Sequence, residues 1–465
     1  MTVTVTDIHS ELNETVVDEI VAVSSLDDIR LAVRRASKRD LPLAIAGGRH
    51  AMGGQQFCRG GMLIDTRPLD RVLAFDAEHG TVEVEAGIQW PALIAHLASA
   101  QVGSQPQWAI AQKQTGADRL SIGGAIAANV HGRGLALRPF VADVESFVLV
   151  DGEGEARVCS REEDAELFRL ATGGYGLFGC VYSARLRLVP RRTLERVVEV
   201  RSADDLMQAF EARIREGFVY GDFQFATDPA SDDFLRKGVF SCYRPVEDRE
   251  SLPAGQRALS RADWERLIYL AHTDKTRAFE RYAEHYLATT GQLYYSDTHQ
   301  LADYADGYHR ALAERLGSSE GATEMITEIY VPRDRLPDFL DAAADDLRRL
   351  GANVIYGTIR LVEPDDETFL AWATERWACI IFNLCTVHTE EGIARAADAF
   401  RRLISLAIDR GGSYYLTYHR WATREQVETC YPQFAEFLGL KQEYDPTGRF
   451  ASDWYRHYRA LFAPA

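Results

Sequence analysis

The sequence predicts an α+β protein with two main domains and a short C-terminal segment. The chain has 465 residues, enough for two or three domains of roughly 100–200 residues each. Residues 1–195 contain three glycine-rich loops, each next to a strand-like run. Residues 196–425 have fewer glycines and many aromatic residues, and helical and extended patterns alternate there, which is typical of an α+β domain. We expect residues 426–465 to pack back on the first domain.

Composition and charge argue against several classes of protein. A hydrophobic content of 46% and a charged content of 26% are ordinary for a globular protein. The net charge of −17 argues against binding of nucleic acid through its phosphates. No stretch approaches the ~20 apolar residues of a membrane span, and residues 1–20 lack the apolar run of a signal peptide. The seven cysteines are scattered without a C-x-x-C pair, which favours reduced thiols in a cytoplasmic protein.

The first domain begins with a helix, a strand and a glycine loop. Ser24 and Ser25 can cap the helix, and the acidic residues that follow suit the positive end of its dipole. The apolar residues 41–46 indicate a buried strand, and residues 47–55 form the first glycine loop. Glycine lets a backbone approach a ligand closely, and successive N–H groups can hold an anion. His50 is not needed for that; it is either bonded to a backbone carbonyl or has a second role.

The second glycine region, residues 115–134, has a centre of small apolar residues. Something flat can pack against such a backbone, and tight packing of helix on sheet is the alternative. His131 in this region is either a ligand contact or a histidine satisfied within a turn. Between the first loop and this region we expect three strands and a helix, at residues 62–65, 72–75, 81–85 and 90–100.

The third glycine loop, residues 173–181, follows a hairpin at residues 147–159 and a helix at residues 162–171. Gly174 to Gly179 has the G-x-G-x-x-G spacing, but a helix precedes it and a strand follows it, the reverse of a dinucleotide-binding turn. The P-loop and H-E-x-x-H motifs do not occur. Three separated loops suit a long ligand in an extended conformation, and FAD is such a ligand.

The second domain is predicted from the alternation of helical and extended patterns. Residues 244–260 are rich in charged residues and proline and indicate an exposed loop or lid. We expect helices at residues 203–216, 264–289, 296–316, 334–350 and 389–409, and strands at 220–225, 326–331, 354–362, 378–385 and 413–417.

Residues 15–195 resemble the FAD-binding domain of the vanillyl-alcohol oxidase and p-cresol methylhydroxylase (PCMH) superfamily. The resemblance implies a PCMH-type FAD-binding domain of two subdomains and an α+β substrate domain whose large antiparallel sheet is flanked by helices. Cytokinin dehydrogenases, also similar here, have a histidine at the position of His50 that is joined to the 8α-methyl group of the flavin. The resemblance therefore implies FAD bound covalently through His50. Residues 103–134 lack the cysteine that makes a second attachment in some relatives, and Arg49 stands where a glycine is commoner.

The same resemblance implies a set of cofactor contacts spread over the three glycine regions. Besides His50, they are Gly47, Gly48, Arg49, Ala51, Met52, Gly53, Gln55, Thr115, Gly116, Ser121, Ile122, Gly124, Ala127, His131, Gly132, Gly179 and Val181.

Two smaller groups of the superfamily resemble other parts of the chain. Residues 126–132, 164–179 and 450–453 are similar to decaprenylphosphoryl-ribose oxidase, in which the flavin is not covalently bound. Residues 418–421, and the segment around Asp445, are similar to aldonolactone and alditol oxidases. Those enzymes have a catalytic glutamate and arginine on the strand that matches Ile359-Arg360, but Thr358 replaces the glutamate here. Because of this departure, the resemblance does not establish specificity for polyols, but the expected type of reaction is unchanged.

Oxidation of an alcohol by a flavin needs a base for the hydroxyl proton and a cation near the reduced flavin. Histidine has a suitable pKa, so His419 is the predicted base and Tyr418 its hydrogen-bond partner; a purely orienting role for His419 is the alternative. Arg360 is the predicted cation, with an ion pair to Asp365 or Asp366 as its alternative. Asn383 either binds substrate hydroxyls or makes a structural hydrogen bond.

Further polar side chains are weaker candidates for the substrate site. We expect Glu328 and Tyr330 on one face of a strand, and Tyr220, Asp222 and Gln224 on one face of another. Tyr294, Tyr295 and His299 are interpreted as ordinary residues of an aromatic-rich helix.

The expected function is a covalent-flavin oxidase that acts on the CH–OH group of a small polar alcohol, sugar, polyol or lactone and releases hydrogen peroxide. One alternative is a dehydrogenase of the same fold that passes electrons to a quinone or a protein. The other is a flavin-binding or carbohydrate-binding protein without activity. We expect a small-molecule substrate and O2 or another electron acceptor as partners, with no metal; the sequence does not indicate an oligomeric state.

Overall fold

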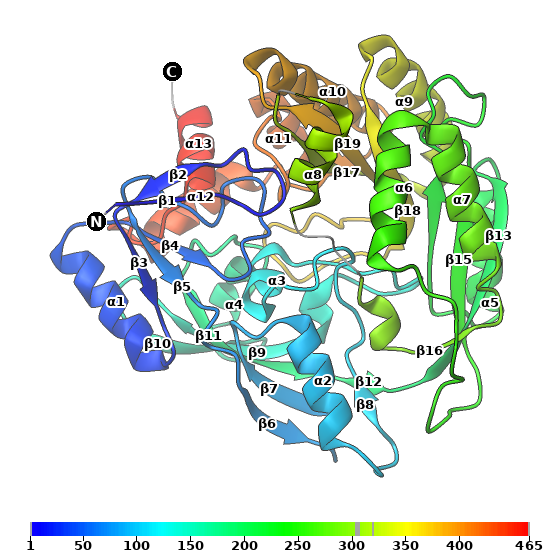
Figure 1. Ribbon diagram of the computed structural model, residues 1–465. Coiled ribbons are helices and arrows are strands. Elements are labelled where there is room, and N and C mark those ends of the chain that lie inside the picture. The colour runs from blue at the N-terminus through cyan, green and yellow to red at the C-terminus, as the bar shows by residue number, and fades with distance from the viewer. Residues whose placement is uncertain (1, 303–306, 319, 464–465) are drawn as a thin grey trace.

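A three-stranded parallel sheet and the helix beside it form the N-terminal end of the molecule (Figure 1). The computed structural model describes residues 2–302, 307–318 and 320–463. Helix α1 (Leu26–Lys38) begins at Ser25, whose hydroxyl accepts a hydrogen bond from the Asp28 N–H at 3.2 Å, so the predicted cap is confirmed. The sheet, in the order β3-β5-β4, and the adjoining hairpin consist of β1 (Val3–Val5), β2 (Thr15–Val17), β3 (Glu19–Ala22), β4 (Leu43–Ala46) and β5 (Met62–Asp65).

A five-stranded antiparallel sheet completes this half of the molecule, in the order β10-β9-β11-β7-β6. Its strands are β6 (Val72–Asp76), β7 (Thr81–Glu85), β9 (Val144–Val150), β10 (Ala156–Ser160) and β11 (Cys180–Arg187). The helices of this half after α1 are α2 (Trp90–Ala100), α3 (Ile122–Ala128), the 3-10 turn η1 (Phe140–Asp143) and α4 (Ala165–Ala171). A short pair, β8 (Trp108–Ala109) with β12 (Val189–Pro190), leads toward the second half.

The second half is organised around an eight-stranded antiparallel sheet in the order β16-β13-β15-β14-β18-β19-β17-β20. Its strands are β13 (Thr193–Ser202), β14 (Tyr220–Phe225), β15 (Lys237–Pro245), β16 (Leu293–Tyr295), β17 (Ala322–Pro332), β18 (Val354–Val362), β19 (Trp377–Val387) and β20 (Ser413–Tyr414). The two sheets and the helices around them confirm the predicted α+β class.

Helices cover both faces of the large sheet. On one face pack α5 (Leu206–Arg215), α9 (Leu336–Leu350) and α10 (Glu390–Ile408), as in the contact of Phe339 on α9 with Phe382 on β19. The pair α6 (Arg261–Thr273) and α7 (Lys275–Leu287) contacts β18, β13 and β15 and lies in front of the sheet in Figure 1. Since both faces are covered, the central strand β19 is almost continuously apolar, as its sequence Trp-Ala-Cys-Ile-Ile-Phe shows.

The prediction of helix over residues 296–316 is largely wrong. In the described part of this range, the chain leaves β16 and forms a 3-10 turn, η2 (Thr298–Gln300), and then a helix, α8 (Tyr308–Leu316). Residues 303–306 of that prediction lie outside the described residues. The tyrosines that suggested an aromatic helix belong instead to β16, which pairs with β13. The last predicted strand is also shorter than expected, since β20 contains two residues.

The C-terminal segment returns to the first half of the molecule. It contains α11 (Arg424–Cys430), α12 (Phe434–Tyr444) and α13 (Asp453–Leu461). Phe450 forms a parallel bridge with Leu43 of β4, and the N–H groups of Asp453 and Trp454 donate to carbonyls of Phe57 and Gly54 at 2.7 and 3.3 Å. The segment therefore extends the parallel sheet next to the first glycine loop.

A buried ion pair fixes the start of this segment. Lys441 Nζ lies 2.6 Å from Asp445 Oδ2, and both side chains are inaccessible to solvent. The same carboxylate accepts hydrogen bonds from the backbone N–H groups of Arg449 (2.8 Å) and Phe450 (2.7 Å). Asp445 thus sets the path of the turn that brings Phe450 beside Leu43.

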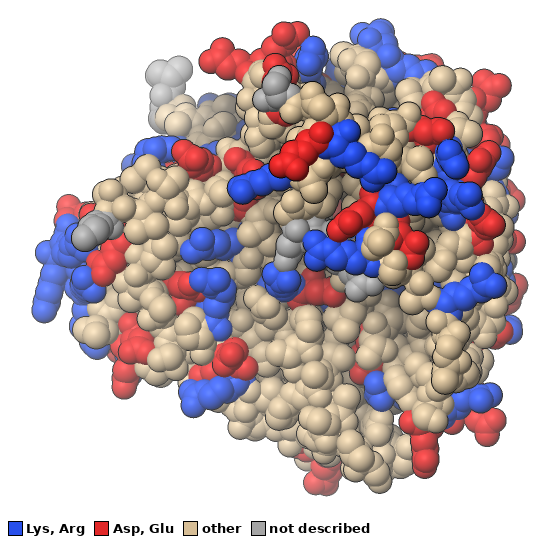
Figure 2. All heavy atoms as spheres, in the orientation of Figure 1, with Lys and Arg blue, Asp and Glu red and all other residues tan. Residues whose placement is uncertain are grey.

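Positively and negatively charged side chains are mixed on the surface of the protein. On the face shown in Figure 2, lysine and arginine side chains alternate with aspartate and glutamate, without one continuous basic patch. Among the described helices, none is long and apolar enough to cross a membrane.

We predict that Asp445→Ala lowers the free energy of unfolding by about 3–5 kcal/mol, because it leaves the Lys441 ammonium buried without its partner. Denaturant unfolding followed by tryptophan fluorescence measures the change. Glu428→Ala, in the exposed pair with Arg424, is the control and should change it by less than about 1 kcal/mol. An unaltered unfolding midpoint for Asp445→Ala would contradict the role of the pair.

Candidate functional site

One cavity of about 650 Å³ runs between the glycine loops and the large sheet. Its wall on the N-terminal side consists of the three glycine regions, with Gly47, Gly124 and Gly176 as examples. The opposite wall consists of side chains from β13, β14, β17, β18 and β19. The cavity therefore joins the two halves of the chain.

At Gly47 and Gly48 the first glycine loop lies so close to its neighbours that no side chain would fit. A Cβ atom on Gly47 would lie 2.2 Å from Ser121 Oγ, and one on Gly48 would lie 2.0 Å from the Arg119 carbonyl oxygen. Within the described part of the chain, the backbone N–H groups of residues 48–51 donate no hydrogen bond. Such unpaired N–H groups on a loop that lines a cavity are suited to anionic oxygens.

Arg49 adopts a conformation that explains why glycine is commoner at its position. Its φ angle is 60°, in the left-handed region that glycine occupies without strain. The side chain is partly buried, and the first causes of its lowered pKa are burial and the nearby charge of Arg67, which Asp65 partly offsets. The loop thus retains the turn that glycine provides and adds a cation to it.

His50 lines the cavity, and its two ring nitrogens differ in their contacts. Its Nδ1 lies 2.7 Å from Nε2 of His9, whereas its own Nε2 makes no hydrogen bond of good geometry among the described residues, although the Arg119 backbone lies close to the ring. Burial, with smaller effects from His9 and Arg119, lowers the pKa of His50 to about 3. The imidazole is therefore neutral at physiological pH and has a nitrogen lone pair available for bonding.

The second and third glycine regions also reach the cavity. Helix α3 is capped by the Ser121 hydroxyl, which accepts from the Gly124 N–H at 3.2 Å, and its small residues Gly124 and Ala127 line the wall. Tyr175 and Gly176 of the third loop lie on the same wall. An elongated cavity with glycine backbone along one side and unpaired N–H groups at the first loop fits the shape and charge of FAD.

The predicted cofactor contacts lie on this wall with three exceptions. Gly53 is close to the side chain of Gln55, Ile122 is fully buried in the core, and Gly132 packs against the Lys113 backbone. None of the three lines the cavity, so for them the prediction is corrected. Each is adjacent in sequence to a residue that does line the cavity.

The pairing of strands in the large sheet brings polar side chains together on the opposite wall of the cavity. Arg360 on β18 pairs with Cys379 on β19, Tyr356 pairs with Asn383, and Glu328 on β17 pairs with Ile381. Since side chains two residues apart share a face, these residues all project to the cavity side of the sheet.

Glu328 is the centre of a buried hydrogen-bond network. Its Oε1 lies 2.5 Å from His131 Nε2 and accepts from the Tyr330 hydroxyl (2.7 Å) and the Cys379 thiol (3.2 Å). Its Oε2 accepts from the Tyr418 hydroxyl at 3.2 Å. Burial opposes ionisation of Glu328, but His131 and these donors outweigh it and lower its pKa to about 2.

The proton between His131 and Glu328 follows from the second ring nitrogen. His131 Nδ1 lies 3.0 Å from the Gly132 carbonyl oxygen, which can only accept, so Nδ1 carries a hydrogen. Nε2 faces a carboxylate oxygen at 2.5 Å, so a second proton must lie between these two atoms. The pair therefore holds a proton at the cavity wall.

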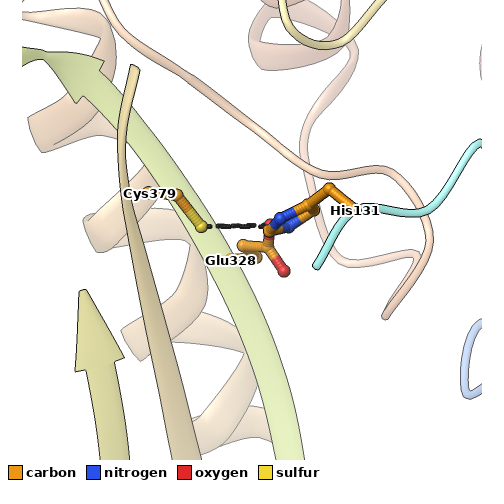
Figure 3. Close-up of side chains that lie close together, drawn as sticks. All are labelled: His131, Glu328 and Cys379. Atoms are coloured by element: carbon orange, nitrogen blue, oxygen red, sulfur yellow. Dashed lines mark hydrogen bonds and ion pairs between the residues drawn. The ribbon is translucent and has the colours of Figure 1, made fainter. Parts of the chain in front are cut away.

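His131, Glu328 and Cys379 could in principle hold a metal ion, because their ligand atoms lie within 4.8 Å of one another (Figure 3). A thiolate is required for that role, but burial, followed by the charge of Glu328, raises the pKa of Cys379 well above its usual value. Glu328 Oε1 also already accepts three hydrogen bonds. The cluster is therefore better described as a network that stores a proton.

Arg360 and Asn383 line the cavity, and each has a buried polar atom without a hydrogen-bond partner among the described residues. Arg360 is buried, and its Nε has no hydrogen-bond partner; Asn383 Oδ1 and Thr358 Oγ1 also lack one. Among the described residues, Arg360 makes no ion pair with Asp365 or Asp366, which instead bind Asn129 and Arg138. Buried groups of this kind indicate that a ligand supplies their partners.

His419 does not line the cavity, which corrects its assignment as the base. Its Nε2 contacts the Thr327 hydroxyl at 3.1 Å, and its Nδ1 accepts from the Trp421 N–H at 3.3 Å. The ring is stacked on Phe400 of α10, behind the sheet. Tyr418 lines the cavity, and His419, one residue later, points to the opposite side.

The sequence reasoning missed the coupling of His131 to Glu328 and the far end of the cavity. That end is formed by Arg133, Arg196, Tyr243, Tyr294 and His299. Alternating polar residues on β14 and β17 were visible in the sequence, but Arg196 and His299 gave no comparable signal. Only the pairing of distant strands brings them together.

Comparison with known proteins agrees with this geometry. The sequence profile described as "FAD binding domain" matches residues 17–160, and the profile described as "D-arabinono-1,4-lactone oxidase" matches residues 320–458. L-gulono-1,4-lactone dehydrogenase of Mycobacterium tuberculosis is 28% identical over 442 residues, 94% of this chain and 95% of the relative. The chain belongs to the PCMH-type superfamily of FAD-linked oxidoreductases.

Other members of the superfamily match over shorter or more divergent stretches. Decaprenylphosphoryl-beta-D-ribose oxidase of Mycolicibacterium smegmatis is 21% identical over 96% of this chain and 95% of its own length. Cytokinin dehydrogenase 4 of Oryza sativa subsp. japonica is 30% identical over 39% of this chain and 35% of its own length. The protein is thus an FAD-linked oxidoreductase that acts on CH–OH donors, and its PCMH-type domain is confirmed.

We predict that Glu328 contributes to stability above pH ~4.5 and that this contribution falls as the pH falls toward 2. Its pKa is lower in the folded state, about 2, than the 4.5 of the free side chain, so the unfolded chain takes up the proton first. Glu328→Gln should therefore lose less stability than the wild type between pH 5 and pH 3. Denaturant unfolding at each pH measures this, with the exposed Glu78→Gln as control; parallel pH profiles for wild type and Glu328→Gln would refute it.

Proposed function

We propose that the protein oxidises a CH–OH group of a sugar-derived lactone, sugar or polyol in an FAD-dependent reaction. The main support is one cavity that has the glycine loops on one wall and Arg360, Asn383 and the Glu328 network on the other. The relatives named for action on gulonolactone and on phosphoryl-ribose have carbohydrate-derived substrates. We place the cofactor on residues 1–195, the substrate on residues 196–425, and the closing segment at residues 426–465.

The residues of the sheet wall have distinct proposed tasks. Bound FAD supplies the acceptor for the hydride that leaves the substrate carbon. Arg360 provides a fixed positive charge in a cavity from which most water is excluded, where charge is most effective. Asn383 provides a carbonyl oxygen that can accept a hydrogen bond from a substrate hydroxyl. Tyr418 is the group that contacts the substrate hydroxyl where its proton leaves, and the His131–Glu328 pair, which already holds its own proton, orients the Tyr418 hydroxyl through Glu328.

We further propose that the flavin is attached covalently through His50. The unpartnered Nε2, the neutral ring and the position on the first glycine loop support this. O2 is the proposed electron acceptor, with hydrogen peroxide as product; the dehydrogenase name of the Mycobacterium tuberculosis relative supports the alternative of another acceptor.

The reaction is tested by mixing the oxidised enzyme anaerobically with lactones, aldoses and polyols and following the flavin absorbance. Bleaching by at least one of them, followed by stoichiometric peroxide on admission of air, supports the proposed oxidase. Bleaching with rapid dye reduction but without peroxide assigns the enzyme to the dehydrogenases. No bleaching by any CH–OH compound would contradict the proposed substrate class.

We predict that His50→Ala abolishes covalent attachment. Acid-precipitated wild-type protein should remain yellow and fluoresce on a denaturing gel, whereas precipitated His50→Ala should be colourless. His96→Ala, which alters an exposed histidine on α2, is the control and should retain the colour. Persistent covalent fluorescence in His50→Ala would refute the attachment site.

We predict that Arg360→Gln lowers kcat/KM by about 10²–10³-fold, because the lost charge acts where charge develops during the reaction. Tyr418→Phe should lower it by about tenfold or more, since the hydroxyl at the proton path is lost. Flavin content, measured by absorbance, should change little in both variants. Arg376→Gln, an exposed arginine near the start of β19, is the control; wild-type kinetics for Arg360→Gln would exclude the proposed role.

A further inference from the structure

The end of the cavity farthest from the parallel sheet contains two arginines that share one aromatic ring. The guanidinium carbons of Arg133 and Arg196 lie 5.0 and 5.1 Å from the centroid of the Tyr243 ring. The two positive charges are therefore at most about 10 Å apart, where they repel each other in a poorly solvated environment. Strands β13 and β15, which carry Arg196 and Tyr243, lie at the right of Figure 1, opposite the glycine loops near β4.

Within the described part of the chain, neither arginine has a carboxylate partner, and no aspartate or glutamate there forms an ion pair with Arg133 or Arg196. Asp222 also lines this part of the cavity, and it acts on Arg133 only through space. Among these three described residues, two cations therefore stand against one carboxylate.

The hydrogen bonds of the two arginines leave one buried donor unused. Arg196 Nε donates to the Tyr243 hydroxyl at 2.8 Å and Nη1 donates to Thr289 Oγ1 at 3.1 Å. Arg133 donates through Nη2 to the His299 carbonyl oxygen, but its buried Nε has no partner. Burying a cation with an unused donor is costly unless another group completes its hydrogen bonds.

His299 gives an independent indication of a ligand. The side chain is only 6% exposed and lines the cavity, and among the described residues neither ring nitrogen makes a hydrogen bond of good geometry, although the backbone of Tyr295 and Ser296 lies close to the ring. Tyr220 and Tyr243 contact the ring with centroids 4.7 Å away, which fixes its orientation. A buried imidazole whose nitrogens lack good partners within the described part of the chain can take a polar partner from a ligand.

We propose that the substrate carries an anionic oxygen group, a carboxylate or a phosphate, and that this group binds in the pocket formed by Arg133, Arg196 and His299. We name these three residues the arginine pocket. Planar guanidinium groups match the geometry of both oxyanions, and a neutral His299 can donate one further hydrogen bond. The inference rests on the proposed function, since it places the anion on the molecule whose CH–OH group is oxidised at the other end of the cavity.

The inference also explains the aromatic surroundings of the pocket. Arg196 lies 4.5 Å from the ring centroid of Tyr294 and 5.1 Å from that of Tyr286. Such rings stabilise a buried cation without neutralising it. The arginines thus remain charged and available, and an anionic sugar is favoured over a neutral one of the same size.

Binding to the oxidised holoenzyme tests the inference without turnover. Isothermal titration calorimetry is performed with three probes: gluconate for the carboxylate, ribose 5-phosphate for the phosphate, and glucitol as the neutral control. We expect at least one anionic probe to bind about tenfold or more tightly than glucitol, and added chloride to weaken it. The stronger of the two anions identifies which oxyanion the pocket prefers.

Variants then assign the affinity to these residues. Arg133→Gln and Arg196→Gln should each raise the dissociation constant of the anionic probe by about tenfold to a hundredfold. The dissociation constant of glucitol should change by less than about threefold. Arg196→Lys retains the charge and should lose less. Arg261→Gln, an exposed arginine on α6, is the control, and flavin absorbance together with circular dichroism shows whether each variant is folded.

The outcomes separate this inference from the proposed function. Equal or weaker binding of both anions relative to glucitol, or wild-type anion affinity in both glutamine variants, overturns the arginine pocket. Anion binding that depends on the arginines supports it even if no compound bleaches the flavin, in which case the proposed oxidation alone fails.

Discussion

The buried hydrogen bond between His131 and Glu328 joins the two halves of the cavity. His131 follows the small-residue helix of the cofactor half, and Glu328 lies on a central strand of the large sheet. Neighbouring contacts strengthen the junction: Asn129 Nδ2 donates to Asp365 at 2.9 Å and the Trp372 indole donates to the Asn129 carbonyl oxygen at 3.1 Å. A cofactor held by one half and a substrate held by the other therefore meet with little freedom, which is the condition for an oriented hydride transfer.

Much of the cofactor half could be predicted from the sequence, because its signals are local. Glycines at fixed spacings, a capping serine and short apolar runs determine the loops and the strands beside them. The left-handed residue 49 shows the limit of such signals: an arginine occupies a conformation that the pattern assigns to glycine. The charges that act on its guanidinium, Asp65 and Arg67, also come from outside the loop.

The substrate half could be predicted only in outline, since its site arises from pairing between distant strands. The motif that contains Tyr418 and His419 was recognised, but which of two adjacent side chains faces the cavity depends on the local path of the chain, and the wrong one was chosen. Arg196 and His299 are more than 100 residues apart and share one ring system only because β13, β15 and β16 are neighbours. The helix predicted from residue 296 begins only at Tyr308, because a short 3-10 turn, η2, follows β16 instead.

The parallel bridge between Leu43 and Phe450 has a consequence for folding. The strand segment beside the first glycine loop, and the backbone contact of Trp454 with Gly54, come from residues about 400 positions later in the sequence. Contacts between such distant residues form more slowly than local ones. The first glycine loop therefore gains its full set of neighbours only when the C-terminal segment packs against it.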